Sequence, residues 1–421
     1  MKFLLVAYND SDGVGQTAVN LNSTLNNLGY KSKLILLNKT VNSKDIFKIR
    51  RSFIKRVFFY FFEFFKKRYS DLFSFGNSTV NFKDLEKHTN EADIIIVYTL
   101  HKILTLNMLA KLYDQKKVVY IRPLDMELAT GGCHVNFLYE SGVECKKYIT
   151  GCGRCPKLNK LNLFDISKKI FKDKKKFMDK YKPTILLENK FTKKIYDNSP
   201  ISKNAKNEVV YLTVRENRKQ IINKKQARDM FQLKEHEKIL LFGTYNFDAP
   251  HKGGRILGEI LNLFVDYCNQ KDRNLLKKNK VKLVTFGRKQ SFKLNISQIS
   301  WLHLNEIKSD KELNALYRLS DVFLSPSTGC NAPSTIREST INNIPTIAFD
   351  NGEASEAIVN KVNGFLIPKF DKNKFAQAIF NTIFDKNLKD DKEWNNLLKL
   401  RYNSKTEAEM IINKALSDFK K

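Results

Sequence analysis

Short, uninterrupted apolar runs alternate with helix-like segments along both halves of the chain. In the first half, Lys2–Tyr8, Ser32–Leu37, Asp93–Tyr98 and Lys117–Ile121 are runs of this kind. Strands buried on both faces have this pattern, whereas strands with one solvated face alternate apolar and polar residues. Strand–helix–strand repetition predicts a parallel sheet covered by helices on both faces. The predicted fold class is therefore α/β.

The second half repeats this alternation. Its predicted strands are Glu208–Thr213, Lys238–Gly243, Lys282–Gly287, Asp321–Ser325 and Pro345–Phe349. A chain of 421 residues suits two domains of about 200 residues each. We place the first domain at residues 1–205, with a cysteine-rich loop at 130–156, and the second at 206–395. Residues 396–421 are expected to form a C-terminal helix that could cross back to the first domain.

The charge balance is strongly basic. Lys and Arg number 74 against 44 Asp and Glu, a formal net charge of +30. This excess favours a polyanionic neighbour, although a Lys-rich codon bias would explain part of it. The start, MKFLLVAYND, lacks the length and cleavage site of a signal peptide. No uncharged apolar run approaches the roughly 20 residues of a spanning helix, so we expect a cytoplasmic chain.

Residues 46–68 form the most unusual segment. Eight Lys or Arg and nine aromatic residues accompany a single acid, Glu63. On a helix, one face would collect Phe47, Ile54, Phe58, Phe61 and Phe65. Such a helix would gain from apolar burial in a bilayer and from anionic headgroups, at about 1 kcal/mol per basic residue. We expect it to bind an anionic membrane surface; packing on the domain's own core is the other interpretation.

Four of the six cysteines lie close together in the first half. Cys133, Cys145, Cys152 and Cys155 have the spacing C-x11-C-x6-C-x2-C. Four thiolates can close a tetrahedral zinc site, and the Cys152-Gly-Arg-Cys155 turn aims two sulfurs at one point. Such a site would be structural, because no position remains for water. His134 could replace one thiolate, and an iron–sulfur cluster or two disulfides remain alternatives.

Four features of the second half favour a nucleotide-diphosphate site. Gly243 ends a predicted strand, and the loop that follows carries Lys252, whose charge can neutralise a diphosphate. Residues 331–335 open a predicted helix, where free N–H groups bind phosphate. Glu338 lies one turn later and could accept both ribose hydroxyls, and residues 350–356 follow another buried strand. Each feature alone has a purely structural explanation; their order favours a ligand site.

These motifs resemble glycosyltransferase family 4, retaining enzymes of the GT-B fold. The strings are FGTYNFDAPHKGG, DVFLSPSTGCNAPSTIRESTINNIPTIAFDNGEASEAI and VNGFLIP, with SDGVGQTAVNLNSTLNNLGY near the start. The stretch LDMELATGGCH followed by CGRCP is similar to a subgroup found in exopolysaccharide, capsule and O-antigen clusters. The resemblance implies two Rossmann-like domains facing across a cleft.

The resemblance also implies roles for individual residues of the second half. Lys252, with His251 as a further cation, would contact the donor diphosphate, and Glu338 would bind the ribose. The remaining donor-binding residues would be Gly243, Asn331, Ser334 and Thr335, the last two through their backbone amides.

In the first half, the resemblance implies an acceptor site. Gly13 and Gly15 would let the N-terminal loop approach the sugar and the acceptor. Asp125 would lie near the acceptor and act with Lys252 in catalysis.

Three positions depart from the family pattern. The first acid of the family's acid–seven residues–acid motif falls on Cys330, so the donor sugar lacks its usual carboxylate partner. Leu124 stands where the subgroup has His before Asp125. The Arg that usually precedes the Lys is absent, with Thr244 and Tyr245 nearby.

The expected function is that of a retaining, metal-independent hexosyltransferase of surface-polysaccharide synthesis. It would use a nucleotide-diphosphate sugar and a lipid-linked or oligosaccharide acceptor, at the inner face of the cytoplasmic membrane. A possible structural zinc is the only cofactor expected. Two alternatives remain: a basic, zinc-containing nucleic-acid-binding protein, and a catalytically inactive GT-B scaffold at the membrane. Nucleic acid is not the expected partner, because the aromatic residues gather on one helix instead of interleaving along a sheet or groove.

Overall fold

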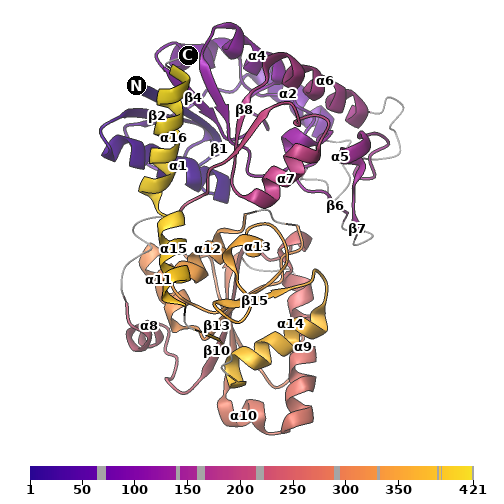
Figure 1. Cartoon of the computed structure of the whole chain (residues 1–421), viewed down its shortest axis with the longest axis vertical. Coiled ribbons are helices and arrows are strands. Elements are labelled where there is room, and N and C mark those ends of the chain that lie inside the picture. Colours follow the sequence, from indigo (N-terminus) through magenta and orange to yellow (C-terminus); the bar gives the residue numbers. More distant parts are fainter. Residues whose placement is uncertain are drawn as a thin grey trace. The chain divides into compact units, whose positions relative to one another are not determined.

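The computed structural model describes residues 1–63, 73–138, 143–158, 166–214, 222–288, 294–329, 332–385, 388–389 and 391–419. The chain divides into two compact units (Figure 1). Unit 1 comprises residues 1–212 and 404–421, and unit 2 comprises residues 213–403. Each unit contains a parallel sheet with flanking helices, which confirms the predicted α/β class.

The sheet of unit 1 has seven parallel strands in the order β3-β2-β1-β4-β5-β8-β9. They are β1 (Lys2–Asn9), β2 (Lys31–Asn38), β3 (Ile46–Lys48), β4 (Ile94–Val97), β5 (Val118–Ile121), β8 (Thr184–Leu187) and β9 (Lys206–Val209). Along β1, Leu4 and Val6 enter one apolar cluster while Phe3 and Leu5 enter another, so both faces of the sheet are buried. Double burial explains why β1 reads as an uninterrupted apolar run.

Helices cover both faces of this sheet, and a short hairpin lies in the cysteine-rich loop. The described helices are α1 (Gly13–Asn27), α2 (Phe53–Glu63), α3 (Phe82–Thr89), α4 (Leu106–Asp114), α5 (Lys147–Thr150), α6 (Ile166–Tyr181), α7 (Lys190–Asn198) and α16 (Ser404–Phe419). The hairpin pairs β6 (Phe137–Leu138) with β7 (Val143–Glu144).

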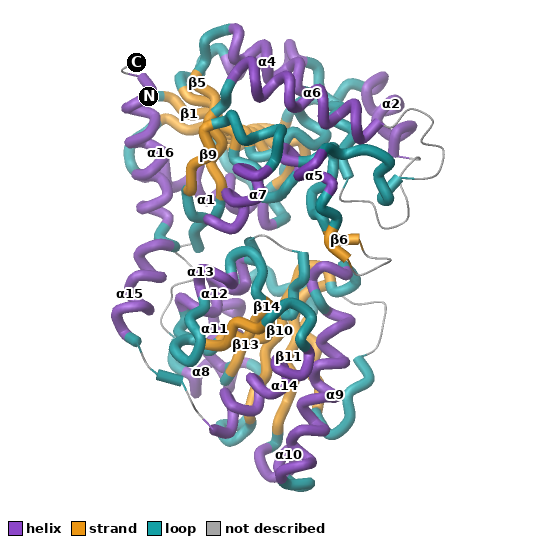
Figure 2. Tube along the Cα trace, turned by 45° about the vertical axis from the view of Figure 1, so that its right-hand side comes forward, coloured by secondary structure: helices purple, strands orange, loops and turns teal. Residues whose placement is uncertain are grey.

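Unit 2 has six parallel strands in the order β12-β11-β10-β13-β14-β15, drawn in orange in Figure 2. They are β10 (Lys238–Asn246), β11 (Val281–Arg288), β12 (Ser300–Leu304), β13 (Val322–Ser325), β14 (Thr346–Phe349) and β15 (Gly364–Ile367). The described α-helices are α8 (Lys224–Met230), α9 (Gly254–Lys271), α10 (Leu275–Asn279), α11 (Asp310–Leu319), α12 (Ser334–Ile341), α13 (Ala354–Ala357), α14 (Lys372–Phe380) and α15 (Lys392–Arg401).

The last helix returns to unit 1. Residues 396–421 are not one helix, because α15 ends at Arg401 and α16 begins at Ser404. A buried ion pair anchors α16: Arg122 Nη2, just after β5, lies 2.6 Å from Glu407 Oε1. The Tyr120 hydroxyl also donates to Asp418 over 2.8 Å. An unpaired charge at this depth would be strongly destabilising, so the pair holds the returning helix against the sheet.

The segment 46–68 is not one continuous helix. Ile46–Lys48 forms β3, which pairs in parallel with β2 at the edge of the sheet, and α2 begins only at Phe53. Phe47 therefore cannot share a helix face with Phe58, and Phe65 lies outside the described residues. Pairing with β2 is favoured over a helix here because it removes the side chains of Ile46 and Ile49 from water; each is only 4% exposed. Among the described residues, no helix is long and apolar enough to cross a membrane.

Both sheets contain a point at which the strand order reverses. In unit 1, β1 lies between β2 and β4, and in unit 2, β10 lies between β11 and β13. Loops leaving adjacent strands in opposite directions separate at such a point, and ligands of open α/β sheets bind there, at the carboxyl ends of the strands. The loops after β1 and β4, and those after β10 and β13, are therefore the places to examine for function.

Candidate functional site

In unit 2, the loop after β10 carries His251 and Lys252 in a short 3₁₀ helix, Pro250–Lys252. Gly253 then begins α9 with a left-handed backbone, at φ 80°. A Cβ added at Gly253 would lie 2.0 Å from the carbonyl oxygen of Pro326, so only glycine allows this approach. Gly243, inside β10, similarly faces the Phe286 ring, which an added Cβ would meet at 2.0 Å. The structure thus gives Gly243 a packing role.

Two hydrogen bonds join this loop to the segment after β13. The carbonyl oxygen of His251 accepts from the Thr328 N–H over 2.9 Å and from the Ser327 hydroxyl over 2.8 Å. The same segment leads to α12, which begins at Ser334. The loop of Lys252 and the approach to α12 therefore lie side by side at the strand-order reversal of unit 2.

The start of α12 suits an anion. Its N-cap position is Pro333, no side chain caps it, and its first turn contains no acid. Ser334 and Thr335 are partly exposed. The free N–H groups at such a helix start carry partial positive charge and bind phosphate or carboxylate oxygens. Asn331, also predicted to bind the donor, lies outside the described residues, as does Cys330.

Glu338 lies further along α12 and is buried, with 4% of its surface exposed. One of its carboxylate oxygens accepts a hydrogen bond from the Tyr317 hydroxyl over 2.7 Å. Tyr317 comes from α11 and is buried as well. The structure therefore gives the predicted ribose ligand a protein partner that sequence reasoning missed, because no spacing pattern links α11 to α12.

A second buried group of unit 2 was also missed. Arg337 Nη1 lies 3.1 Å from Glu353 Oε2, and both side chains are almost fully buried. The Tyr402 hydroxyl donates to the same carboxylate over 2.6 Å. Glu353 belongs to the segment 350–356, whose position after a buried strand was the only sequence signal. Its carboxylate holds α12, α13 and the end of α15 together.

In unit 1, the two glycines predicted to contact the acceptor differ in their surroundings. A Cβ added at Gly15 would lie 1.8 Å from the carbonyl oxygen of Asn9, whereas one at Gly13 would meet nothing within 4 Å. The Asp12 carboxylate caps α1, accepting from the Gly15 N–H over 2.7 Å. The start of α1 is therefore already occupied by the Asp12 side chain, unlike that of α12. Gly15 allows α1 to approach the Asn9 carbonyl of β1 closely.

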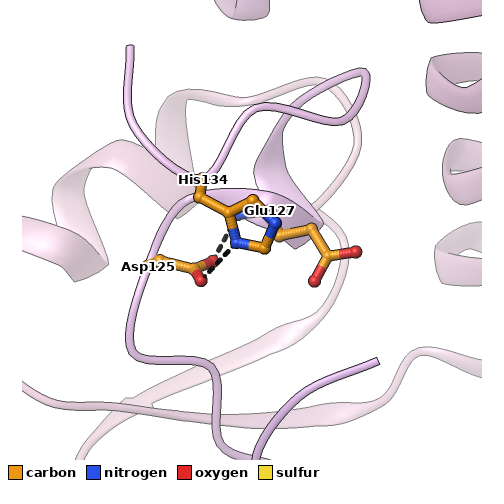
Figure 3. Close-up of side chains that lie close together, drawn as sticks. All are labelled: Asp125, Glu127 and His134. Carbon is orange, nitrogen blue, oxygen red and sulfur yellow. Dashed lines mark hydrogen bonds and ion pairs between the residues drawn. The ribbon is translucent and has the colours of Figure 1, made fainter. Parts of the chain in front are cut away.

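Asp125 lies after β5 within a small polar cluster (Figure 3). Its carboxylate is 2.7 Å from His134 Nδ1 and accepts from the Glu127 N–H over 2.7 Å. Ligand atoms of Asp125, Glu127 and His134 lie within 4.8 Å of one another, a spacing that a metal ion could use. Figure 3 shows the imidazole lying between the two carboxyl groups.

A buried lysine lies beside this cluster. The Lys174 ammonium, on α6, donates to the carbonyl oxygens of Glu127 and Thr130 and interacts electrostatically with Glu127 and Asp125. Burial lowers the pKa of Lys174. Burial also opposes charge on His134, but the Asp125 carboxylate outweighs it and raises the imidazole pKa. His134 and Lys174 are thus two basic groups that lie beside these carboxyl groups.

The four predicted zinc ligands are free thiols that interact with one another. The Cys133 thiol donates to Cys155, and this bond lowers the pKa of Cys155 to about 7. The Gly131 N–H donates to Cys152 Sγ over 3.2 Å. Within the described part of the chain, however, no three of the four sulfurs lie within 4.8 Å of one another. The thiols are neighbours without forming a closed tetrahedron.

Comparisons with known proteins agree with this architecture. Residues 255–385 match the protein family described as Glycosyl transferases group 1. Along its whole length the chain resembles sucrose-phosphate synthase from Thermosynechococcus elongatus, covering 99% of that chain with a TM-score of 0.66 and 13% identity. The fold is GT-B.

Two further GT-B structures are similar. HepE from Anabaena, solved in complex with UDP-glucose, has a TM-score of 0.63 and 11% identity over 99% of this chain and 100% of that one. WaaG, a glycosyltransferase involved in lipopolysaccharide biosynthesis, has a TM-score of 0.60 and 12% identity over 98% of both chains. No curated protein matches the chain in sequence. At such low identity, the structures establish the two Rossmann-like domains of a GT-B protein.

The contrast between the two glycines gives a prediction. Gly15→Ala should lower the free energy of unfolding by about 1–3 kcal/mol, because the methyl group overlaps the Asn9 carbonyl oxygen. Gly13→Ala has open space and should unfold in urea as the wild type does. If Gly13 borders the acceptor, this second variant should still lose glycosyl transfer. Equal stability of the two variants would contradict the packing role of Gly15.

Proposed function

We propose that the protein is a retaining glycosyltransferase that moves a hexose from a nucleotide-diphosphate sugar to a lipid-linked or oligosaccharide acceptor in surface-polysaccharide synthesis. The observation that carries the proposal is the pair of hydrogen bonds to the His251 carbonyl oxygen, which keep the loop of Lys252 beside the segment leading to α12. A cationic side chain and an uncapped helix start at one strand-order reversal suit a diphosphate. The group 1 match and the GT-B neighbours support the same class of reaction.

In this proposal, charge stabilisation is the main task of unit 2. Breaking the bond to the anomeric carbon leaves negative charge on the departing diphosphate. Lys252 and the Ser334 and Thr335 amides would stabilise that charge, with His251 as a second cation, so the step needs no catalytic metal. Glu338 would bind the ribose. Because Glu338 is buried and hydrogen-bonded to Tyr317, its carboxylate is held in one orientation before the donor arrives.

Unit 1 would bind the acceptor. Asp125 would face the acceptor hydroxyl, with its orientation fixed by the Glu127 N–H and by His134. A carboxylate held by two donors loses little conformational freedom on binding, which favours positioning of the acceptor.

Replacement of Lys252 tests the donor site. Lys252→Met should lower kcat/KM by about 10²- to 10³-fold, because a cation that stabilises the leaving diphosphate is lost. Lys271→Met, at the other end of α9, is the matched control and should retain activity. The measurement is transfer, together with donor hydrolysis, from UDP-, GDP-, dTDP- and ADP-sugars. A wild-type rate in the folded Lys252 variant would contradict the proposal, and a wild-type chain that binds and turns over no donor would identify an inactive scaffold.

We also propose a structural zinc ion held by Cys133, Cys145, Cys152 and Cys155. The Cys133 thiol lowers the pKa of Cys155 to about 7, which favours one thiolate near neutral pH. The pKa values of Cys133 and Cys152 are raised, so zinc would have to displace their protons. Buried Lys157, whose ammonium lies near Cys133 and Cys155, would offset their negative charge. Binding would have to draw the sulfurs together, to about 2.3 Å from the metal.

The metal content of the purified chain tests this site. We expect one zinc ion per chain by mass spectrometry, and a lower melting temperature after chelation, because folding and metal binding are coupled. Cys152→Ser should lose the zinc, whereas Cys268→Ser, in unit 2, should keep it. Bound iron, or two disulfides in place of a metal, would contradict the proposal.

The third part of the proposal is attachment to an anionic membrane surface through the described part of residues 46–68. Six apolar side chains of α2 are exposed, and Arg50, Arg51, Lys55 and Arg56 accompany them with no acid before Glu63. Apolar and basic groups on one short helix, and on the segment just before it, suit the interface of an anionic bilayer. The protein would then act at the inner face of the cytoplasmic membrane.

Flotation with phosphatidylglycerol vesicles tests the attachment. The wild type should float with these vesicles and much less with phosphatidylcholine, because both apolar and charge contributions are needed. Phe58→Asp with Phe61→Asp should abolish flotation, whereas Leu400→Asp, an equally exposed apolar residue of α15, should not. Salt-sensitive binding to RNA or DNA, without vesicle binding, would favour the nucleic-acid alternative.

A further inference from the structure

The exposed face of α2 is connected to the interior of unit 1 through one aromatic side chain. Phe59 is 3% exposed, in contrast to six apolar neighbours on the helix that are 56–77% exposed. Those six are Phe53, Ile54, Val57, Phe58, Tyr60 and Phe61. The Phe59 ring packs edge-on against His101, with ring centroids 6.0 Å apart. The apolar surface of α2 therefore adjoins the loop that follows β4.

Lys102, the next residue of that loop, lies in an unusual environment. Its ammonium nitrogen is 5.0 Å from the centre of the Tyr8 ring and 5.5 Å from that of Phe59. Aromatic faces attract a cation, but they do not accept the strong hydrogen bonds that an ammonium can donate. In the parts of unit 1 that the structure describes, no carboxylate forms an ion pair with Lys102. Among the described residues of unit 1, the Lys102 ammonium contacts these two aromatic rings.

The backbone holds Lys102 in this position. Its φ of 65° lies in the left-handed region, which is uncommon for a residue other than glycine. Its carbonyl oxygen accepts from the Thr79 N–H over 2.9 Å and from the Thr79 hydroxyl over 3.0 Å. These bonds fix the carbonyl and maintain the strained conformation. A strained residue that surrounding bonds maintain is a frequent property of ligand sites.

The same loop adjoins the Asp125 cluster. The rings of His101 and His134 are 5.4 Å apart at nearly right angles, and His134 is bonded to Asp125. A continuous row of contacts thus runs from the apolar face of α2, through Phe59 and His101, to Asp125. Lys102 lies beside the first part of this row, at the strand-order reversal of unit 1.

We propose that Lys102 binds the phosphate of a lipid-linked acceptor whose hydrocarbon chain lies along α2. This inference rests on the proposed function and assigns the acceptor a chemical class: an amphiphile with a phosphate between its apolar chain and its hydroxyl-bearing head. The apolar face of α2, the Lys102 ammonium and the Asp125 carboxylate follow one another in the same order as the hydrocarbon chain, the phosphate and the hydroxyl-bearing head of such a molecule. A bilayer headgroup would need only the exposed residues of α2, and a free phosphate would need only Lys102.

Calorimetric titration with dodecyl phosphate, below its micelle concentration, tests the assignment. Inorganic phosphate and dodecyl maltoside are the comparison ligands, since each presents only one of the two recognised groups. The wild type should bind dodecyl phosphate at least tenfold more tightly than either. Lys102→Met should weaken dodecyl phosphate binding at least tenfold and leave dodecyl maltoside unchanged, while Lys102→Arg should retain binding.

Lys116→Met is the matched control. Lys116 also has a positive φ, 54°, but it lies before the amino end of β5, whereas Lys102 follows the carboxyl end of β4, so replacement of Lys116 should have no effect. Wild-type binding by Lys102→Met, or equal binding of dodecyl phosphate and inorganic phosphate, would overturn the proposal. So would an equal loss of both dodecyl ligands, which would indicate apolar packing alone. UDP binding, measured on the same variants, should not change, and its absence from the wild type would count against the donor site instead.

Discussion

The carbonyl oxygen of His251 is the point on which the candidate donor site depends. It accepts hydrogen bonds from both Ser327 and Thr328, and so joins the loop after β10 to the segment after β13. Gly253 makes this approach possible, because any side chain there would collide with the Pro326 carbonyl. Without these contacts, the cationic loop and the uncapped start of α12 would be independent surface features. With them, both belong to one place at the carboxyl edge of a parallel sheet.

In unit 1, the acidic groups near the corresponding loops have partners within the fold, unlike the uncapped helix start of unit 2. Asp12 caps α1, and Asp125 is bonded to His134, so both acids already have partners within the fold. Lys174 is buried beside the Asp125 cluster, and burial lowers its pKa, yet its ammonium donates to two carbonyl oxygens of the same loop. This arrangement holds the loop that connects Asp125 to the cysteines.

Two features of unit 1, the exposed face of α2 and the surroundings of Lys102, are not explained by packing within the unit. The face of α2 exposes six large apolar side chains, although Phe59 on the same helix is well buried. Lys102 keeps its charge between two aromatic rings. The first feature leaves a patch of apolar surface in water, and such patches mark interaction sites in many proteins. The proposed acceptor, which carries a hydrocarbon chain and a phosphate, would match both features.

The amino-acid sequence determined the strands, and through them the fold class. The runs at Lys238–Gly243 and Asp321–Ser325 are apolar throughout because both faces of their sheet are covered, and the strands β10 and β13 appear where the runs predicted them. Sequence could also indicate Lys252 and the start of α12, because a lysine followed by two glycines and a helix preceded by proline are local patterns. The prediction of one helix over residues 46–68 was wrong in part, because the pairing of Ile46–Lys48 with β2 is a tertiary interaction that the local pattern does not encode.

Only the tertiary structure decided which distant side chains meet. Tyr317 with Glu338, Tyr402 with Glu353, and Arg122 with Glu407 join residues that are far apart along the chain, and no local spacing encodes those pairs. The same holds for Lys102, whose partners Tyr8, Phe59 and Thr79 come from β1, from α2 and from the segment before α3. The apolar pattern of a segment shows which of its faces is buried, because each residue is selected for its own burial. Which side chains of two distant elements meet depends on the tertiary arrangement of those elements, and the sequence of one segment does not contain that information.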